Sequence, residues 1–211
     1  MTNRQDGRRS SRAARRVSRA AQRQHGQGNS EPVPAHTMPR PQPLDADLVC
    51  EAERRGYLEF SPEQTRITYI CARRFTDDYT DPEEQVRAAI YAWLILDRGY
   101  PANRIEVEVP VPRRTPADRA DIVVYGDRHP FLVVEVKKTD SGNAEFERGI
   151  LQGFGNAANL RASYLLVDSG TESIFYDVEN CPDVRDRDRY RLGDRKTWVQ
   201  APPFTAALCS T

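Results

Sequence analysis

The sequence has 211 residues, and its 31 basic and 31 acidic side chains balance to a formal net charge of zero. A hydrophobic fraction of 38% supplies one folded core, and at roughly 100–200 residues per domain the length admits one domain with tails. No apolar run approaches the ~20 residues of a membrane-spanning helix, and the Arg-rich start lacks the apolar stretch of a secretory signal. We therefore expect a cytoplasmic protein without a membrane span, too short for a motor or a second catalytic domain beside its core.

The zero net charge averages two unlike parts. Residues 1–43 contain nine arginines and two acids, a balance of +7, whereas the remainder has 22 bases and 29 acids, a balance of −7. The first part has few large apolar side chains to offset the entropy of ordering, so we expect a disordered Arg/Pro-rich tail over 1–43. Such a tail binds phosphates through counterion release; a solubilising leader and a transit peptide are alternatives with similar composition.

The first half of the folded part contains two expected helices and one expected strand. Residues 48–57 are typical of a short helix and residues 66–72 of a strand. The run Thr80-Asp81-Pro82-Glu83-Glu84 then places a capping side chain, an early proline and two acids where a helix begins. This helix is apolar nearly all round until Gly99, so we expect most of its surface to be buried.

The second half is richer in strands. We expect them at 105–111, 120–125, 131–138, 163–168 and 173–178, with a turn-rich loop at 126–130 that suits a hairpin. A helix over 145–160 contains Gly149, Gly153 and Gly155, which would allow close packing on a sheet. This order predicts an α/β domain over 44–180, with a mixed central sheet flanked by helices, and a charged C-terminal extension over 181–211.

The cysteines and histidines indicate no metal centre of their own. Four cysteines and three histidines are scattered through the chain, without a CxxC pair or Cys/His ligand spacing. This distribution argues against a zinc site and a disulfide framework, and it favours a reducing compartment.

The expected hairpin brings charged residues together. If its loop is centred on residue 128, Asp121 and Glu135 stand opposite each other with Cβ atoms ~4.5–5.5 Å apart, and Lys137 projects from the same face. Two opposed carboxylates repel each other unless a cation lies between them, and a divalent ion with oxygen ligands resolves the conflict. The alternative is a solvated acid–lysine pair that contributes little.

This set of side chains suits phosphodiester hydrolysis. Mg²⁺ held by Asp121 and Glu135 would bind the scissile phosphate and lower the pKa of an attacking water, while Lys137 would orient that water and balance charge. The backbone carbonyl of Val136 and a carboxylate from Glu83 or Glu84 are further candidate ligands. Mg²⁺ and Mn²⁺ both suit oxygen ligands.

The phrases that carry these residues also resemble a known module. DPEEQVRAAIY, RIEVEVPVP, RADIVVY, PFLVVEVKK and EFERGILQGFGNAANLRASYLLVDSG follow one another as in the N-terminal nuclease domain of type I restriction enzyme R proteins. That domain belongs to the PD-(D/E)xK superfamily and is also found ahead of N-6 adenine DNA methylases. The resemblance covers residues 66–178 and implies a restriction-endonuclease-like core.

The resemblance implies a role for each matching residue. Asp121 is similar to the metal-binding Asp of the family, and Glu135 and Lys137 to its (D/E)xK pair. The helix glutamate of the superfamily resembles Glu84 rather than Glu83.

Gln152 resembles the glutamine that follows the active site in many relatives. Those relatives carry a tyrosine four residues later, where this sequence has Asn156. The departure weakens a phosphate-positioning role for the helix, and a polar residue capping the sheet edge is the alternative for Gln152.

Together these features predict a Mg²⁺-dependent DNA endonuclease subunit of a restriction or defence system. Because nothing resembles a base-reading element, we expect a DNA methyltransferase or helicase subunit to supply specificity. A double-strand cut needs two such centres, which favours a homodimer or paired action. The alternatives are a non-catalytic DNA-binding or assembly module, a truncated fragment of a methylase fusion, and a remnant without function.

Overall fold

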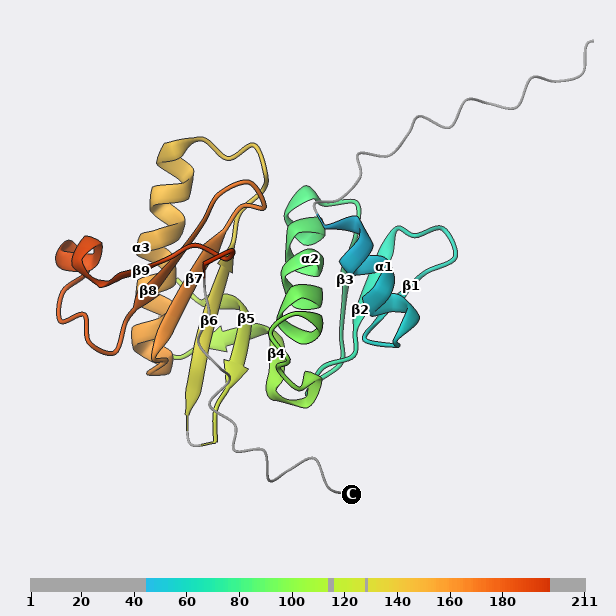
Figure 1. Ribbon diagram of the computed structural model, residues 1–211, viewed down its shortest axis with the longest axis horizontal. Helices are drawn as coiled ribbons and strands as arrows, with labels where there is room; N and C mark the ends of the chain where they lie inside the picture. Colours follow the sequence, from blue (N-terminus) through green and yellow to red (C-terminus); the bar gives the residue numbers. More distant parts are fainter. Residues whose placement is uncertain (1–44, 114–115, 128, 198–211) are drawn as a thin grey trace, which may run out of the picture. The chain divides into compact units, whose positions relative to one another are not determined.

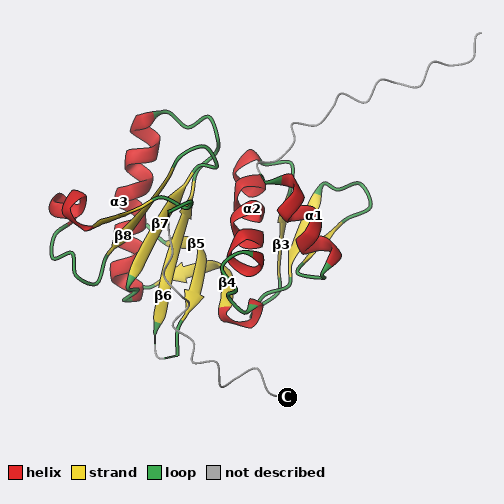
Figure 2. Cartoon of the chain, in the orientation of Figure 1, coloured by secondary structure: helices red, strands yellow, loops and turns green. Residues whose placement is uncertain are grey.

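A computed structural model describes residues 45–113, 116–127 and 129–197 (Figures 1 and 2). The expected tail over 1–43 and the assumed loop centre at residue 128 lie outside the described residues. The described part has a mixed α/β fold with a six-stranded mixed sheet flanked by helices, which confirms the predicted fold class.

Three α-helices and nine strands make up this part of the chain. The helices are α1 (Ala46–Arg54), α2 (Pro82–Leu96) and α3 (Asn143–Leu160), with 3-10 turns η1 (Ala102–Arg104) and η2 (Val184–Tyr190). The strands are β1 (Leu58–Phe60), β2 (Arg66–Tyr69), β3 (Phe75–Asp78), β4 (Ile105–Val111), β5 (Asp118–Tyr125), β6 (Pro130–Val136), β7 (Tyr164–Asp168), β8 (Ser173–Asp177) and β9 (Arg191–Gly193). Among the described ranges no helix combines the length and apolarity needed to cross a membrane.

The strands form two sheets. Strands β1, β2 and β3 pair in that order, and β4 to β9 form the larger sheet in chain order. All neighbours are antiparallel except β6 and β7, which are parallel and joined through α3. A parallel pair requires such a crossover, which places α3 against the strand that carries Glu135.

The sequence did not indicate three of these strands. β1 and β9 have three residues each, and β3 has the sequence FTDD, so none offers an apolar alternation. They exist because a neighbour pairs with them: β2 pairs with both β1 and β3, and β8 with β9. Strand preference depends strongly on such neighbours.

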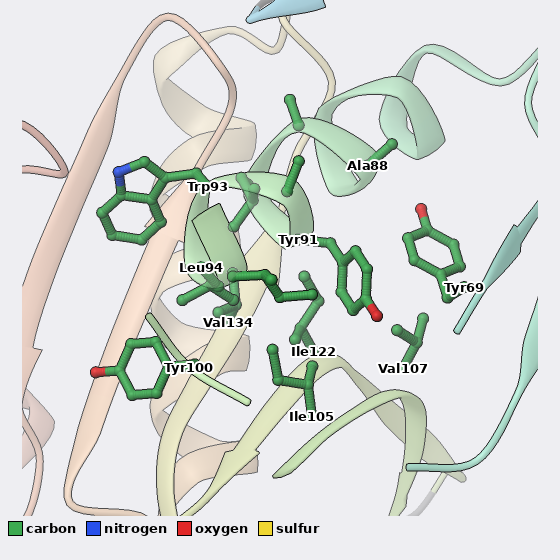
Figure 3. Close-up of a cluster of buried hydrophobic side chains, with 14 of the residues drawn as sticks. Tyr69, Ala88, Tyr91, Trp93, Leu94, Tyr100, Ile105, Val107, Ile122 and Val134 are labelled. Atoms are coloured by element: carbon green, nitrogen blue, oxygen red, sulfur yellow. The ribbon is translucent and has the colours of Figure 1, made fainter. Parts of the chain in front are cut away.

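Helix α2 begins where the sequence predicts. The Asp81 carboxylate accepts the Glu83 N–H at 2.9 Å, and Pro82 occupies the first helical position. Every residue from Val86 to Ile95 is buried, because α2 lies between the two sheets (Figure 1). Figure 3 shows the resulting core, in which α2 side chains meet Tyr69 of the smaller sheet and apolar residues of the larger one.

Helix α3 covers the opposite face of the larger sheet through Phe146, Ile150, Phe154 and Ala157. Two of its glycines permit the close approach that the sequence predicts. A Cβ atom at Gly153 would lie 2.7 Å from Leu165 Cδ1, and one at Gly149 would lie 2.8 Å from Lys137 Cε. A side chain at Gly153 would press against buried Leu165 of β7, whereas one at Gly149 would displace the flexible end of the Lys137 side chain.

Strand β4 changes faces in its middle. Ile105 and Val107 belong to the core beneath α2, whereas Val109 and Val111 belong to the core beneath α3. Regular alternation would place all four on one face. The change occurs at Glu108, whose φ of 55° lies in the left-handed region.

The neighbouring strand β5 changes faces at the same level. Ala120 packs in the core beneath α3 and Ile122 in the core beneath α2. Because Val107 pairs with Ile122 and Val109 with Ala120, the position between these pairs holds Glu108 and Asp121. These two carboxylates therefore lie where the sheet exchanges its faces.

The charged segment after residue 180 adds to the fold. β9 extends the larger sheet, and Arg195 follows it with its side chain largely buried. The Arg195 guanidinium lies 2.8 Å from Asp45 and 3.4 Å from Asp168, and it stacks over the Trp93 ring at 5.8 Å. This arginine connects the last described residues to α1, β7 and α2.

The packing of α3 generates a first prediction. Gly153→Ala should lower the free energy of unfolding by about 1–3 kcal/mol, because its methyl group overpacks the buried Leu165 side chain. In a Leu165→Ala background the obstructing Leu165 Cδ atoms are absent, so Gly153→Ala should lower the free energy of unfolding only slightly. Urea unfolding of the four proteins measures the coupling; an equal cost in both backgrounds would contradict it.

Candidate active site

The β5–β6 hairpin has the register expected from the sequence. Its pairs next to the site are Ile122–Val134, Val123–Val133 and Val124–Leu132. Continuing this register by one residue places Asp121 opposite Glu135. The irregularity between Val124 and Tyr125 lies on the loop side of these pairs.

Asp121 is 8% exposed, and both of its carboxylate oxygens accept hydrogen bonds. Arg87 Nη2 donates to Oδ1 at 2.8 Å, and the backbone N–H of Val136 donates to Oδ2 at 2.7 Å. Val136 thus meets the site through its amide, whereas the sequence had suggested its carbonyl as a ligand.

Glu135 and Lys137 form a buried ion pair beside α3. Glu135 is 1% exposed and its Oε1 accepts from Lys137 Nζ at 2.9 Å. Burial, with a contribution from the Asp121 charge, raises the pKa of Glu135 to about 8 although Lys137 opposes the shift. Burial lowers the pKa of Lys137, but the charges of Glu135 and Asp121 outweigh it and the net shift is upward.

Arg87 is the residue at this site that sequence reasoning missed. Its side chain is 8% exposed and contacts four acids on four elements. The partners are Glu84 Oε2 at 2.5 Å, Glu108 Oε1 at 2.8 Å, Asp121 Oδ1 at 2.8 Å and Asp77 Oδ2 at 3.6 Å. These charges raise the pKa of Arg87 against the effect of its burial. An arginine inside an otherwise apolar helical run was the available signal, since such a residue requires buried partners.

The two acids at the start of α2 have different surroundings. Glu84 accepts from Tyr69 Oη and from Arg87, each at 2.5 Å, and its contact with Asp121 runs through Arg87. Burial raises the pKa of Glu84 to about 7, although Arg87 opposes the shift. Glu83 is paired instead with Lys137, with its Oε1 3.8 Å from Lys137 Nζ.

Glu108 is a second residue that the sequence did not single out. In IEVEVPV it looks like an outward residue of a regular strand, but its left-handed backbone departs from that pattern. Its carboxylate contacts Arg87 at 2.8 Å and lies 3.8 Å from Arg119 Nε. Backbone strain of this kind, about 1 kcal/mol or more, is frequent at functional sites.

From α3 the polar side chain of Asn156 approaches Glu135. Its side chain is fully buried, donates to the Arg119 carbonyl at 3.2 Å and lies 3.5 Å from Glu135 Oε2. Gln152 instead donates to Asp118 at 3.2 Å, one turn earlier. Asn156 therefore approaches Glu135 directly, whereas Gln152 contacts Asp118, at the start of β5.

The carboxylate oxygens suit Mg²⁺ or Mn²⁺, which prefer hard oxygen ligands. Across residues 45–113, 116–127 and 129–197, however, no three acidic, histidine or cysteine side chains come close enough together to hold a metal ion. Both oxygens of Asp121 and Oε1 of Glu135 accept hydrogen bonds, from Arg87, the Val136 backbone and Lys137. The donor set fits such an ion in kind, and Arg87 is the cation that contacts Asp121 in this structure.

Comparison with known proteins gives one family. Residues 82–185 match the family described as "Type I restriction enzyme R protein N terminus (HSDR_N)". This part of the chain is similar to that family. The matched segment runs from the first residue of α2 into η2 and so contains Arg87, Glu108, Asp121, Glu135 and Lys137. The match to this family supports a nuclease-related role in restriction or defence. The search of curated proteins found no match to the chain.

The buried Glu84 generates a prediction about pH. The pKa of Glu84 is raised from 4.5 to about 7, so the stability associated with its neutral form is present below pH 4.5 and lost as the pH rises through 7. The free energy of unfolding of the wild type, relative to that of Glu84→Gln, should therefore fall between pH 4.5 and 7.5. Urea unfolding across this range tests it, with the exposed Glu53→Gln as control; a difference that is constant or rises with pH would oppose it.

Proposed function

We propose that this chain is a nuclease module that hydrolyses phosphodiester bonds of DNA with Mg²⁺ or Mn²⁺, within a restriction or defence system. The observation that carries the proposal is the end of the β5–β6 hairpin, where the Asp121 carboxylate accepts the N–H of Val136, the residue after Glu135, at 2.7 Å and Lys137 Nζ lies 2.9 Å from Glu135. The family match supports the same direction.

The acids and the lysine have separable tasks in this proposal. Asp121 and Glu135 would hold the metal, with Glu108 close enough to Asp121 to join them through their shared contact with Arg87. When bound, the metal would neutralise phosphate charge and lower the pKa of a water molecule.

Lys137 acts in its charged form. Because the surrounding carboxylates raise its pKa, its ammonium group stays protonated at neutral pH and cannot accept a proton from water. It donates hydrogen bonds instead, to a water nucleophile or to the phosphate oxygens on which negative charge develops. Glu135 and the α3 surface at Gly149 hold its side chain in position.

DNA is the proposed substrate, and methyltransferase or helicase subunits are the proposed partners. An R-protein family name implies action alongside other subunits, and paired action by two copies would give a double-strand cut. A non-catalytic DNA-binding or assembly module is the second candidate function. The observation in its favour is Arg87, which already neutralises part of the charge on Asp121.

Loss of the Asp121 carboxylate tests the enzyme proposal. Purified wild-type protein with Mg²⁺ or Mn²⁺ should cleave supercoiled or linear DNA, chelation should abolish cleavage, and Asp121→Asn should lower it by about 100-fold or more. Asp127→Asn, on the exposed hairpin loop, is the matched control and should retain wild-type activity. Equal cleavage by wild type and Asp121→Asn would refute the site. Metal-independent DNA binding without cleavage, alone or with partner subunits, would favour the binding module.

The position of Lys137 gives a separate test. In Gly149→Ala the new methyl group would lie 2.8 Å from Lys137 Cε, so the ammonium group must shift. Since a misplacement of about 1 Å can cost 10²-fold, DNA cleavage should fall by about 10- to 100-fold with little change in unfolding free energy. Gly142→Ala, with no atom within 4 Å of the added Cβ, should stay near wild type. A Gly149→Ala protein with full activity would argue against the lysine's role.

A further inference from the structure

We infer that Arg87 is the counter-cation of the metal-free site and that it competes with a divalent cation for Asp121 and Glu108. The inference rests on the proposed function, because it concerns the metal of that same site. It assigns Glu84 as a residue that holds Arg87 rather than as a metal ligand.

The two ends of the guanidinium face different partners. Nη2 lies 2.8 Å from both Glu108 and Asp121, the two strand residues at the level where the sheet exchanges faces. Nη1 lies 2.5 Å from Glu84 and 3.6 Å from Asp77, on the side of α2 and the smaller sheet. One planar group therefore bridges the strand carboxylates and the helix carboxylate.

Charge explains why the bridge forms without metal. Glu84, Glu108 and Asp121 share contact with Arg87 in a region nearly closed to water, and buried carboxylates require such partners. Arg119, 3.8 Å from Glu108, is a more exposed second cation. One guanidinium offsets only part of this negative charge. A divalent cation would offset more, so the site retains a reason to exchange one cation for the other.

Arg87 and a metal cannot share Asp121 without cost. Both oxygens of Asp121 already accept N–H groups, one from Arg87 and one from the Val136 backbone. The Val136 N–H belongs to the strand backbone and is fixed in place, whereas the Arg87 donor is a side-chain group that can move. A divalent cation placed beside Asp121 would also repel the guanidinium at short range and in a region of low dielectric constant.

Glu84 and Asp77 provide the place to which Arg87 withdraws. If Nη2 releases Glu108 and Asp121, Nη1 still has its contact with Glu84, which Tyr69 Oη holds at 2.5 Å. The positive charge then remains paired on the α2 side. The exchange needs a change in one side chain and no change in the backbone.

Mn²⁺ binding to the full-length chain, followed by electron paramagnetic resonance of free Mn²⁺, tests the competition without reference to cleavage. Arg87→Gln should bind Mn²⁺ about 10-fold more tightly or better than wild type, since the competing charge is gone. Its metal-free form should unfold at lower temperature, and Mn²⁺ should raise that temperature by more than in wild type. Arg104→Gln, which removes an arginine bonded to the Gly126 carbonyl, is the control and should bind Mn²⁺ as wild type does.

Two further variants keep the test decisive. Arg87→Lys preserves charge but cannot bridge both strand acids, so its Mn²⁺ affinity should fall between those of wild type and Arg87→Gln; it serves if Arg87→Gln does not fold. In the Arg87→Gln background, adding Glu84→Gln should leave Mn²⁺ affinity unchanged if Glu84 acts only through Arg87. A loss of about 10-fold or more there would make Glu84 a ligand and overturn that assignment.

The outcomes separate this inference from the proposed function. Equal or weaker Mn²⁺ binding by Arg87→Gln, in a protein whose wild type binds Mn²⁺ and cleaves DNA, overturns the competition alone. Absence of Mn²⁺ binding in wild type and in both Arg87 variants overturns the metal site itself and the competition with it.

Discussion

The need to pair buried carboxylates governs this structure. Glu84, Glu108, Asp121 and Glu135 lie on one helix and three adjacent strands with little access to water, and the two largely buried cations beside them are Arg87 and Lys137. Arg87 serves the first three and Lys137 serves Glu135. A buried charge without a partner would cost several kcal/mol. The position of α2, which carries Arg87, and that of α3, which packs against Lys137, must therefore allow both cations to reach the acids.

Backbone geometry then decides which side chains can meet. The left-handed residue at Glu108 turns β4 from one face of the sheet to the other, and β5 changes faces at Asp121 beside it. At that level the α2 side, through Arg87, and the α3 side, through Asn156, both reach the acids. The glycines at 149 and 153 bring α3 within contact of β6, where Lys137 and Glu135 are held.

Sequence reasoning succeeded where the relevant interaction is local. Asp81 and Pro82 mark the start of α2, and the short loop after Tyr125 sets the expected register of β5 and β6 as far as Ile122–Val134, next to Asp121 and Glu135. It failed where partners are distant along the chain, as for Arg87 and Asp121, which lie 34 residues apart. It also failed at Glu108, because alternation alone cannot reveal a left-handed residue in a strand, and at the short strands that exist only through pairing.

By itself, the sequence determined the α/β class, the buried helix and the hairpin that carries Asp121 and Glu135, since capping, periodicity and turn length act over a few residues. It also carried the resemblance to the R-protein N terminus. Only the tertiary structure decided that Arg87 occupies the centre of the acids, that Glu108 joins them and that Glu84 faces away toward Tyr69. The reason is physical: a buried charge is satisfied by whichever partner the packed fold brings within about 3 Å, and sequence distance says nothing about that choice.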